Sequence, residues 1–252
     1  MPSWLYVVKI KFYDVKIAIT SLASYMWPAS LWNRNASLDE DTHTVETPKH
    51  AYHHGDLRGA LLRAAEEELT EKGMEGFTLR GCAKRAGVSH AAPAHHFKDA
   101  NALLTELAAI GFERFTEAMH ARQRQAGDDP RWRLINAGLG YIDFATANPA
   151  LFGLMFSSFR TDFETAHLKD HSSAAFHLLV ASVAAARHTT PSNDPRLLRD
   201  VAAAWSTAHG LADLVMSNRM PFLDAISGGD IEGLYADIIG RSVPDEPLTG
   251  AP

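Results

Sequence analysis

The chain has 252 residues, of which 46% are hydrophobic and 21% are charged, a balance typical of a globular protein with a sizeable core. Its formal net charge of -6 excludes a protein that is basic over its whole surface, although a local basic surface is still compatible with DNA binding. The single cysteine, Cys82, excludes an internal disulfide and argues against a thiolate zinc site, and it favours the reducing cytoplasm.

Residues 1–50 differ in character from the rest of the chain. The first part is apolar, but three lysines and an aspartate interrupt it, so neither a signal peptide nor a membrane span is expected. A membrane-surface stretch remains an alternative, and residues 33–50 are polar and typical of a linker. We expect a poorly ordered leader and linker over 1–50 and no membrane partner, with Met26 as one candidate for a later start.

Beyond residue 50 the apolar residues recur at helical spacing, and no segment predicts a strand. The expected helices, in chain order, are 56–73, 78–86, 89–97, 101–125, 131–147, 150–159, 164–187, 195–219 and 229–241. Thr78, Ser89 and Asp99 are expected to cap the second, third and fourth of them. The sequence therefore predicts an all-α fold with a three-helix head and a larger helical body.

Residues 78–97 predict two short helices joined by a tight turn. Ala83 is small enough for the two helices to pack closely, and Gly87 can adopt the positive φ of the turn. Small side chains on the outer face of the second helix would let it lie deep in the DNA major groove, which is about 12 Å wide. Basic residues that can bind phosphates surround it, namely Arg80, Lys84, Arg85 and Lys98. An α-hairpin within a helical bundle is the alternative.

The residues of this segment that we expect to contact DNA lie on that outer face or beside it. They are Thr78, Arg80, Lys84, Ser89, His90, Ala91, Ala94, His95, His96 and Lys98.

The stretches YHHGDLRGALLRAAEEELTEKG and FTLRGCAKRAGVSHAAPAHHFKDANALL resemble the N-terminal DNA-binding domain of the TetR/AcrR family over residues 52 to about 115. Downstream, NPALFGLMFSS and AWSTAHGLA resemble the C-terminal domain of the subfamily with a Trp-His-Gly signature, here Trp205, His209 and Gly210. The resemblance implies a cytoplasmic homodimer, a repressor that binds palindromic double-stranded operator DNA and is released by a small-molecule effector.

With this resemblance, we divide the chain into a leader and linker, a head, a body and a tail. The expected spans are 1–50 for the leader and linker, 51–114 for the helix-turn-helix head, 115–243 for the effector-binding and dimerisation body, and 244–252 for a flexible tail.

Two positions depart from the family pattern. Ala94 replaces an aromatic residue, most often tyrosine, and Ala100 replaces a lysine, and both family residues commonly contact phosphates. The alternative function is therefore a helical small-molecule- or protein-binding module with weakened DNA binding. Gly81 and Cys82 also replace better helix formers, and a glycine inside a helix costs about 0.5–1 kcal/mol relative to alanine.

Most aromatic and methionine side chains of the body are expected in the core, and a few are candidates to line an apolar effector pocket with a few polar groups. We expect the lining to include Tyr141, Phe152, Met155, Phe156, Trp205 and His209, with Tyr141 and His209 as the polar groups.

Thirteen histidines make a metal-dependent activity a third alternative. His167 and His171 are one helical turn apart and can reach one metal ion, with Asp170 or Glu164 as a third ligand. The zinc-hydrolase pattern is absent, however, and so are a Gly-rich phosphate loop and a nucleophile elbow. We therefore predict no metal, no cofactor and no enzymatic activity.

Overall fold

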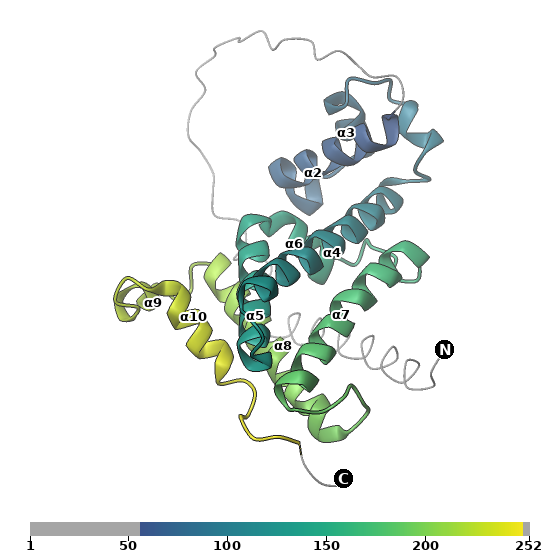
Figure 1. The fold of residues 1–252 in the computed structure, drawn as a ribbon. Coiled ribbons are helices and arrows are strands. Elements are labelled where there is room, and N and C mark those ends of the chain that lie inside the picture. Colours follow the sequence, from purple (N-terminus) through teal and green to yellow (C-terminus); the bar gives the residue numbers. More distant parts are fainter. Residues whose placement is uncertain (1–55, 249–252) are drawn as a thin grey trace. The chain divides into compact units, whose positions relative to one another are not determined.

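The computed structural model describes residues 56–248, and every regular element in that range is a helix (Figure 1). The elements are α2 (Leu57–Gly76), α3 (Leu79–Arg85), the 3-10 helix η2 (Ala92–His95), α4 (Ala100–Gln125), α5 (Pro130–Ala147), α6 (Pro149–Ser157), α7 (Ala166–Ala186), α8 (Pro195–Met216), α9 (Phe222–Ile226) and α10 (Ile231–Gly240). The predicted all-α fold is confirmed. The expected leader and the candidate start at Met26 lie outside the described residues. No helix in the described range is long and apolar enough to cross a membrane.

Residues close to each other in the sequence determine where the head helices begin and where they are interrupted. The side chain of Thr78 accepts a hydrogen bond from the backbone N–H of Gly81 at 3.0 Å and begins α3. The Asp99 carboxylate accepts from the N–H of Ala102 at 2.8 Å and begins α4. Gly73, with φ of +65°, interrupts α2 where the first helix was expected to end. Both caps are confirmed, because a short side-chain acceptor satisfies an N–H that has no partner within the helix.

The expected α-helix at 89–97 is wrong in type and length. Only Ala92–His95 is regular, as the 3-10 helix η2. The Ser89 side chain makes no cap; its backbone carbonyl accepts from the N–H of Ala92 at 3.0 Å. Pro93 has no N–H to donate to residue 89, so the neighbouring backbone groups form i to i+3 hydrogen bonds instead.

The body helices begin and end close to the expected positions. α5 and α8 each start with a proline, and the preceding Asp129 and Asp194 accept hydrogen bonds from the first free backbone N–H groups. The short helix α9 was not expected, since five residues give too little periodicity to recognise.

The helix α4 belongs to both the head and the body. It is continuous over 26 residues, and the expected boundary between residues 114 and 115 falls inside it. It packs against α5, α6 and α7, and it buries Leu103, Leu104 and Leu107 almost completely. Any movement of the body helices against α4 is therefore passed directly to a helix that begins in the head.

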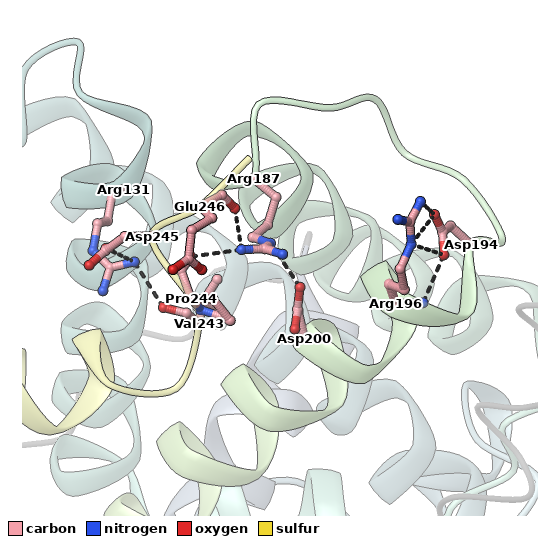
Figure 2. Close-up of polar contacts among 9 residues, drawn as sticks. All are labelled: Arg131, Arg187, Asp194, Arg196, Asp200, Val243, Pro244, Asp245 and Glu246. Atoms are coloured by element: carbon pink, nitrogen blue, oxygen red, sulfur yellow. Dashed lines mark hydrogen bonds and ion pairs between the residues drawn. The ribbon is translucent and has the colours of Figure 1, made fainter. Parts of the chain in front are cut away.

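The segment that follows α10 is held by two arginines (Figure 2). Arg131 at the start of α5 donates to the carbonyl of Val243 at 2.9 Å, and its Nη1 lies 2.7 Å from Oδ1 of Asp245. Arg187, which caps the end of α7, donates to the carbonyl of Pro244 at 3.2 Å, and its own backbone carbonyl accepts from the N–H of Leu248 at 3.0 Å. The described part of the tail that we expected to be flexible, 244–248, is thus attached to α5 and α7.

The guanidinium of Arg187 also forms a buried ion pair (Figure 2). Its Nε lies 3.0 Å from Oδ2 of Asp200 on α8, and both side chains are largely withdrawn from solvent. Because an unpaired buried charge is costly, this pair ties α7 to α8 and fixes the arginine that holds the tail.

Candidate functional site

The predicted helix-turn-helix is present as α3, a tight turn and η2. Gly87 in the turn has φ of +68°, the left-handed conformation that favours glycine. The backbone N–H of Val88 donates to the carbonyl of Ala83 at 3.0 Å, and the Ala83 side chain is completely buried. Pro93 and Phe97 are buried on the inner side of the second segment. These contacts leave the opposite side of η2 facing solvent.

All of the side chains expected to contact DNA are exposed. They are Thr78, Arg80, Lys84, Ser89, His90, Ala91, Ala94, His95, His96 and Lys98. Three of these are cations that make no ion pair with any residue of 56–248: Arg80, Lys84 and Lys98. The surface therefore combines short side chains with unneutralised positive charge, which suits close contact with a polyanion.

Arg85, the other basic residue expected at this surface, is instead part of an internal ion cluster. Its Nε donates to Glu68 at 2.5 Å, its Nη2 donates to Glu71, and its Nη1 lies 4.0 Å from Glu67. Hydrogen bonds from Lys72 and Arg85 lower the pKa of the Glu71 carboxyl to about 2. Arg85 therefore holds α3 on α2 and is not available to bind phosphates.

Gly81 belongs to the same cluster, and its place in a helix is explained by a close approach. A Cβ at this position would collide with the carboxylate of Glu68, which is itself buried under Arg85. The glycine lets α3 lie against that carboxylate, at the cost of weaker helix propensity.

The body contains a cluster of aromatic rings around Tyr141 of α5 and His209 of α8. The phenol oxygen of Tyr141 lies 2.6 Å from Nδ1 of His209. Phe152 and Phe156 of α6 lie beside His209, with ring centroids at 5.4 Å and 5.2 Å from the imidazole, the first ring tilted and the second edge-on. The structure thus brings together four of the six residues that we expected at an effector pocket.

Burial sets the ionisation of both polar members of this cluster. It raises the pKa of the Tyr141 phenol far above its usual range, an effect that a hydrogen bond from the Trp205 side chain partly opposes. Burial lowers the pKa of His209, and the nearby Asp213 carboxylate only partly offsets this. At neutral pH the phenol is protonated and hydrogen-bonded to a neutral imidazole, and the two groups carry no net charge.

The two other expected pocket residues lie at the edges of the cluster. Met155 is fully buried against Gly111 of α4, where any Cβ would touch its sulfur, so it packs between α4 and α6. Trp205 interacts with Tyr141 and packs edge-on against Phe176, with 6.4 Å between ring centroids.

Several rings that complete the cluster were not singled out from the sequence. Phe115 of α4 lies 4.7 Å from Tyr141 between centroids, and Phe112 lies 5.3 Å from Phe156. Phe115 was recognisable as part of the apolar stripe of its helix, but that stripe alone does not say which neighbour it meets.

Arg160, which was also missed from the sequence, joins the segment after α6 to the head. Its Nη1 donates to the backbone carbonyl of Met74 at 2.9 Å, and its Nε donates to the side chain of Asn101 at 3.0 Å. Its guanidinium also lies over the ring of Phe77, 5.8 Å from the centroid. Arg160 lies in a loop, where no periodic pattern marks a residue for such a role.

The described histidines form no three-ligand metal site. Within residues 56–248, no group of three or more His, Cys, Asp or Glu side chains is arranged to hold a metal ion. Glu164, one of the expected third ligands beside His167 and His171, instead pairs with Lys169 at 2.8 Å. His167 and His171 themselves do approach each other, as described below.

Two family models match the chain, one on the head and one on the body. The model of bacterial regulatory proteins of the tetR family matches residues 61–107, and that of the tetracyclin repressor-like C-terminal domain matches residues 134–237. Together they cover more than half of the chain. The chain belongs to the TetR family. This is a family of regulatory proteins rather than of enzymes, in agreement with the sequence-based prediction.

Two curated TetR-type regulators are similar to the head region. The HTH-type transcriptional regulator BetI of Stenotrophomonas maltophilia is 36% identical over 77 residues, 31% of this chain and 39% of that protein. The class C tetracycline repressor of Escherichia coli is 41% identical over 76 residues, 30% of this chain and 32% of that protein. The chain thus matches less than half the length of either relative.

A solved structure is similar over almost its entire length. It is a protein of unknown function from Rhodococcus sp. RHA1, 33% identical to this chain with a TM-score of 0.62, and the match covers 77% of this chain and 99% of that one. The similarity therefore extends through both the head and the body.

Proposed function

We propose that the chain is a DNA-binding transcriptional repressor of the cytoplasm, which binds a palindromic operator in double-stranded DNA and is released by a small-molecule effector. The observation that carries this proposal is the exposed face of η2 with Arg80, Lys84 and Lys98 beside it. Short side chains such as Ala91 and Ala94 allow the backbone to approach base edges, and the cations bind phosphates.

The effector binds in the body, at the aromatic cluster around Tyr141 and His209. The cluster is apolar, and its phenol and imidazole are neutral at pH 7, which favours an apolar effector without net charge. Trp205 and His209 lie four residues apart on α8 and both interact with Tyr141. This shared role supports assignment to the Trp-His-Gly subfamily.

Effector binding lowers DNA affinity through α6 and the loop after it. Phe152 and Phe156 of α6 line the cluster, and Arg160 a few residues later contacts Met74 and Phe77 of the head. An effector that binds better to one position of α6 therefore also favours one position of the head. The free energy of DNA binding then becomes less favourable by the difference between the effector's binding free energies for the two states.

The repressor acts as a homodimer through α8 and the helices after it. One short recognition segment reads too few base pairs for useful specificity, whereas two heads related by twofold symmetry read a palindrome. Exposed apolar side chains support this interface, namely Leu214 on α8 and Phe222 and Ile226 on α9.

A second candidate function is a helical small-molecule- or protein-binding module with weakened DNA binding. Ala94 is exposed on η2 and Ala100 is the first residue of α4, and neither side chain can bind a phosphate. The exposed cations Arg80, Lys84 and Lys98 favour the repressor function over this alternative.

Fluorescence anisotropy separates the two functions. The purified protein is titrated into labelled DNA from just upstream of its own gene and into a scrambled duplex, across a series of salt concentrations, with Lys84→Ala as the variant and Lys169→Ala in the body as its control. The repressor function predicts tight, sequence-selective binding with a steep salt dependence, weakened only by Lys84→Ala. Weak binding that is equal for both duplexes and both variants supports the alternative.

A further inference from the structure

Two histidines on α7 face each other one helical turn apart. The Nε2 atoms of His167 and His171 lie 3.1 Å apart, and the two rings are nearly perpendicular, at 80°. At this distance an N–H of one ring can donate to the lone pair of the other. The same convergence of nitrogens is what a bound metal ion requires.

The separation of the two nitrogens suits one ion without movement of the backbone. With metal–nitrogen bonds of about 2.05 Å, a nitrogen–nitrogen distance of 3.1 Å corresponds to an angle of about 98° at the metal. This value lies between the right angle of octahedral or square-planar coordination and the wider tetrahedral angle. Late first-row divalent ions, which bind imidazole well, adopt these geometries.

A carboxylate from another helix orients one of the two rings. Oε1 of Glu106, a largely buried side chain on α4, lies 2.8 Å from Nδ1 of His167, and Arg58 of α2 holds the same oxygen at 2.7 Å. When the carboxylate accepts the Nδ1 proton, the lone pair of that imidazole is left on Nε2. Histidine ligands of metals are commonly held in this way, by a carboxylate on the nitrogen that does not bind the ion.

We propose that His167 and His171 bind one late first-row divalent metal ion through their Nε2 atoms, with Glu106 as the positioning residue for His167. Water completes the coordination, because the described residues supply no group of three protein ligands. The ion takes the place of the proton between the two rings; His171 releases that proton from Nε2 to water and takes one from water at Nδ1, so both imidazoles bind as neutral ligands. The site joins α7 to α4 and, through Arg58, to α2 of the head.

Isothermal titration calorimetry with Ni²⁺ tests this site independently of DNA binding. The full-length protein is used without an affinity tag and after removal of metal, as the wild type, His171→Ala and Glu106→Gln. His177→Ala, on the same helix but six residues from His171, is the matched control. Circular dichroism establishes that each variant is folded.

We expect the wild type and His177→Ala to bind one more equivalent of Ni²⁺ than His171→Ala. In Glu106→Gln this equivalent should bind at least about tenfold more weakly. Comparison between variants separates this site from the other histidines of the chain. An unchanged stoichiometry and affinity in His171→Ala would overturn the proposal, as would the absence of Ni²⁺ binding by the wild type at millimolar ion.

Discussion

The phenol oxygen of Tyr141 and Nδ1 of His209 are hydrogen-bonded across 2.6 Å, and this bond joins α5 to α8 inside the aromatic cluster. Tyr141 is buried and His209 is half-buried, so the phenol cannot replace its partner with solvent. The pair is therefore both a structural link and the polar part of the proposed effector site.

Removing the phenol oxygen should destabilise the protein. Tyr141→Phe leaves a half-buried imidazole nitrogen without its hydrogen-bond partner, which costs about 1–3 kcal/mol in the free energy of unfolding. Urea denaturation measures the loss. Tyr235→Phe is the matched control, since that phenol is only partly buried, and it should change stability by less than about 0.5 kcal/mol. Equal losses in the two variants would contradict the assigned role of Tyr141.

His209 should make the free energy of unfolding fall as the pH is lowered. Because burial lowers its pKa in the folded protein, the unfolded chain takes up a proton near pH 6.5 while the folded protein does not. The unfolded state then binds more protons, so the free energy of unfolding falls as pH drops below about 6.5, and is unaffected by this group above that value.

The variant His209→Gln, which cannot titrate, isolates this contribution. Urea denaturation of both proteins between pH 8 and pH 5 should give parallel curves at the alkaline end. The wild type should then lose stability more steeply than the variant below about pH 6.5. Curves that stay parallel over the whole range would show that His209 titrates normally.

Alanine substitutions at two helical glycines should have opposite effects. Gly81→Ala places a methyl group against the Glu68 carboxylate and should destabilise the protein by about 1–3 kcal/mol, despite the better helix propensity of alanine. Gly153→Ala on α6 meets no atom within 4 Å and should stabilise it by about 0.5–1 kcal/mol. Urea denaturation compares the two. A stabilising Gly81→Ala would mean that α3 does not lie against Glu68.

Restoring the two residues that are common in the family should raise the affinity of the protein equally for every DNA sequence. In Ala94→Tyr/Ala100→Lys the new side chains add phosphate contacts, so affinity rises and the slope of log affinity against log salt steepens by about 1 for the added lysine. Anisotropy titrations measure both quantities. Ala181→Lys adds the same charge on an exposed position of α7 and should change neither. A double variant that binds like the wild type would indicate that these positions do not face the phosphates.

Features set by neighbouring residues were predictable from the sequence. Thr78 and Asp99 cap their helices because a side-chain oxygen reaches an N–H only three residues away. That η2 is a 3-10 helix was not predictable in this way. The sequence shows Pro93, but whether its missing N–H shortens an α-helix or changes it to a 3-10 helix depends on how Pro93 and Phe97 pack.

Contacts between distant segments could be predicted only in part. Tyr141 and His209 were expected in one site, although nothing in the sequence indicated that they would bond to each other across 68 positions. Arg85 was expected to face DNA, but its pairing with Glu68 depends on how α3 crosses α2. Local periodicity does not encode such crossings, which arise from packing of the whole head.

The proposed DNA-binding function is tested most directly by incubating the purified protein with fragmented genomic DNA from its own organism and sequencing the fragments that it retains. A dimeric TetR-type repressor predicts strong enrichment of a few fragments that share an inverted repeat, with half-sites about one helical turn apart. Uniform recovery of the genome, or recovery no greater than that obtained with Lys84→Ala, would contradict it.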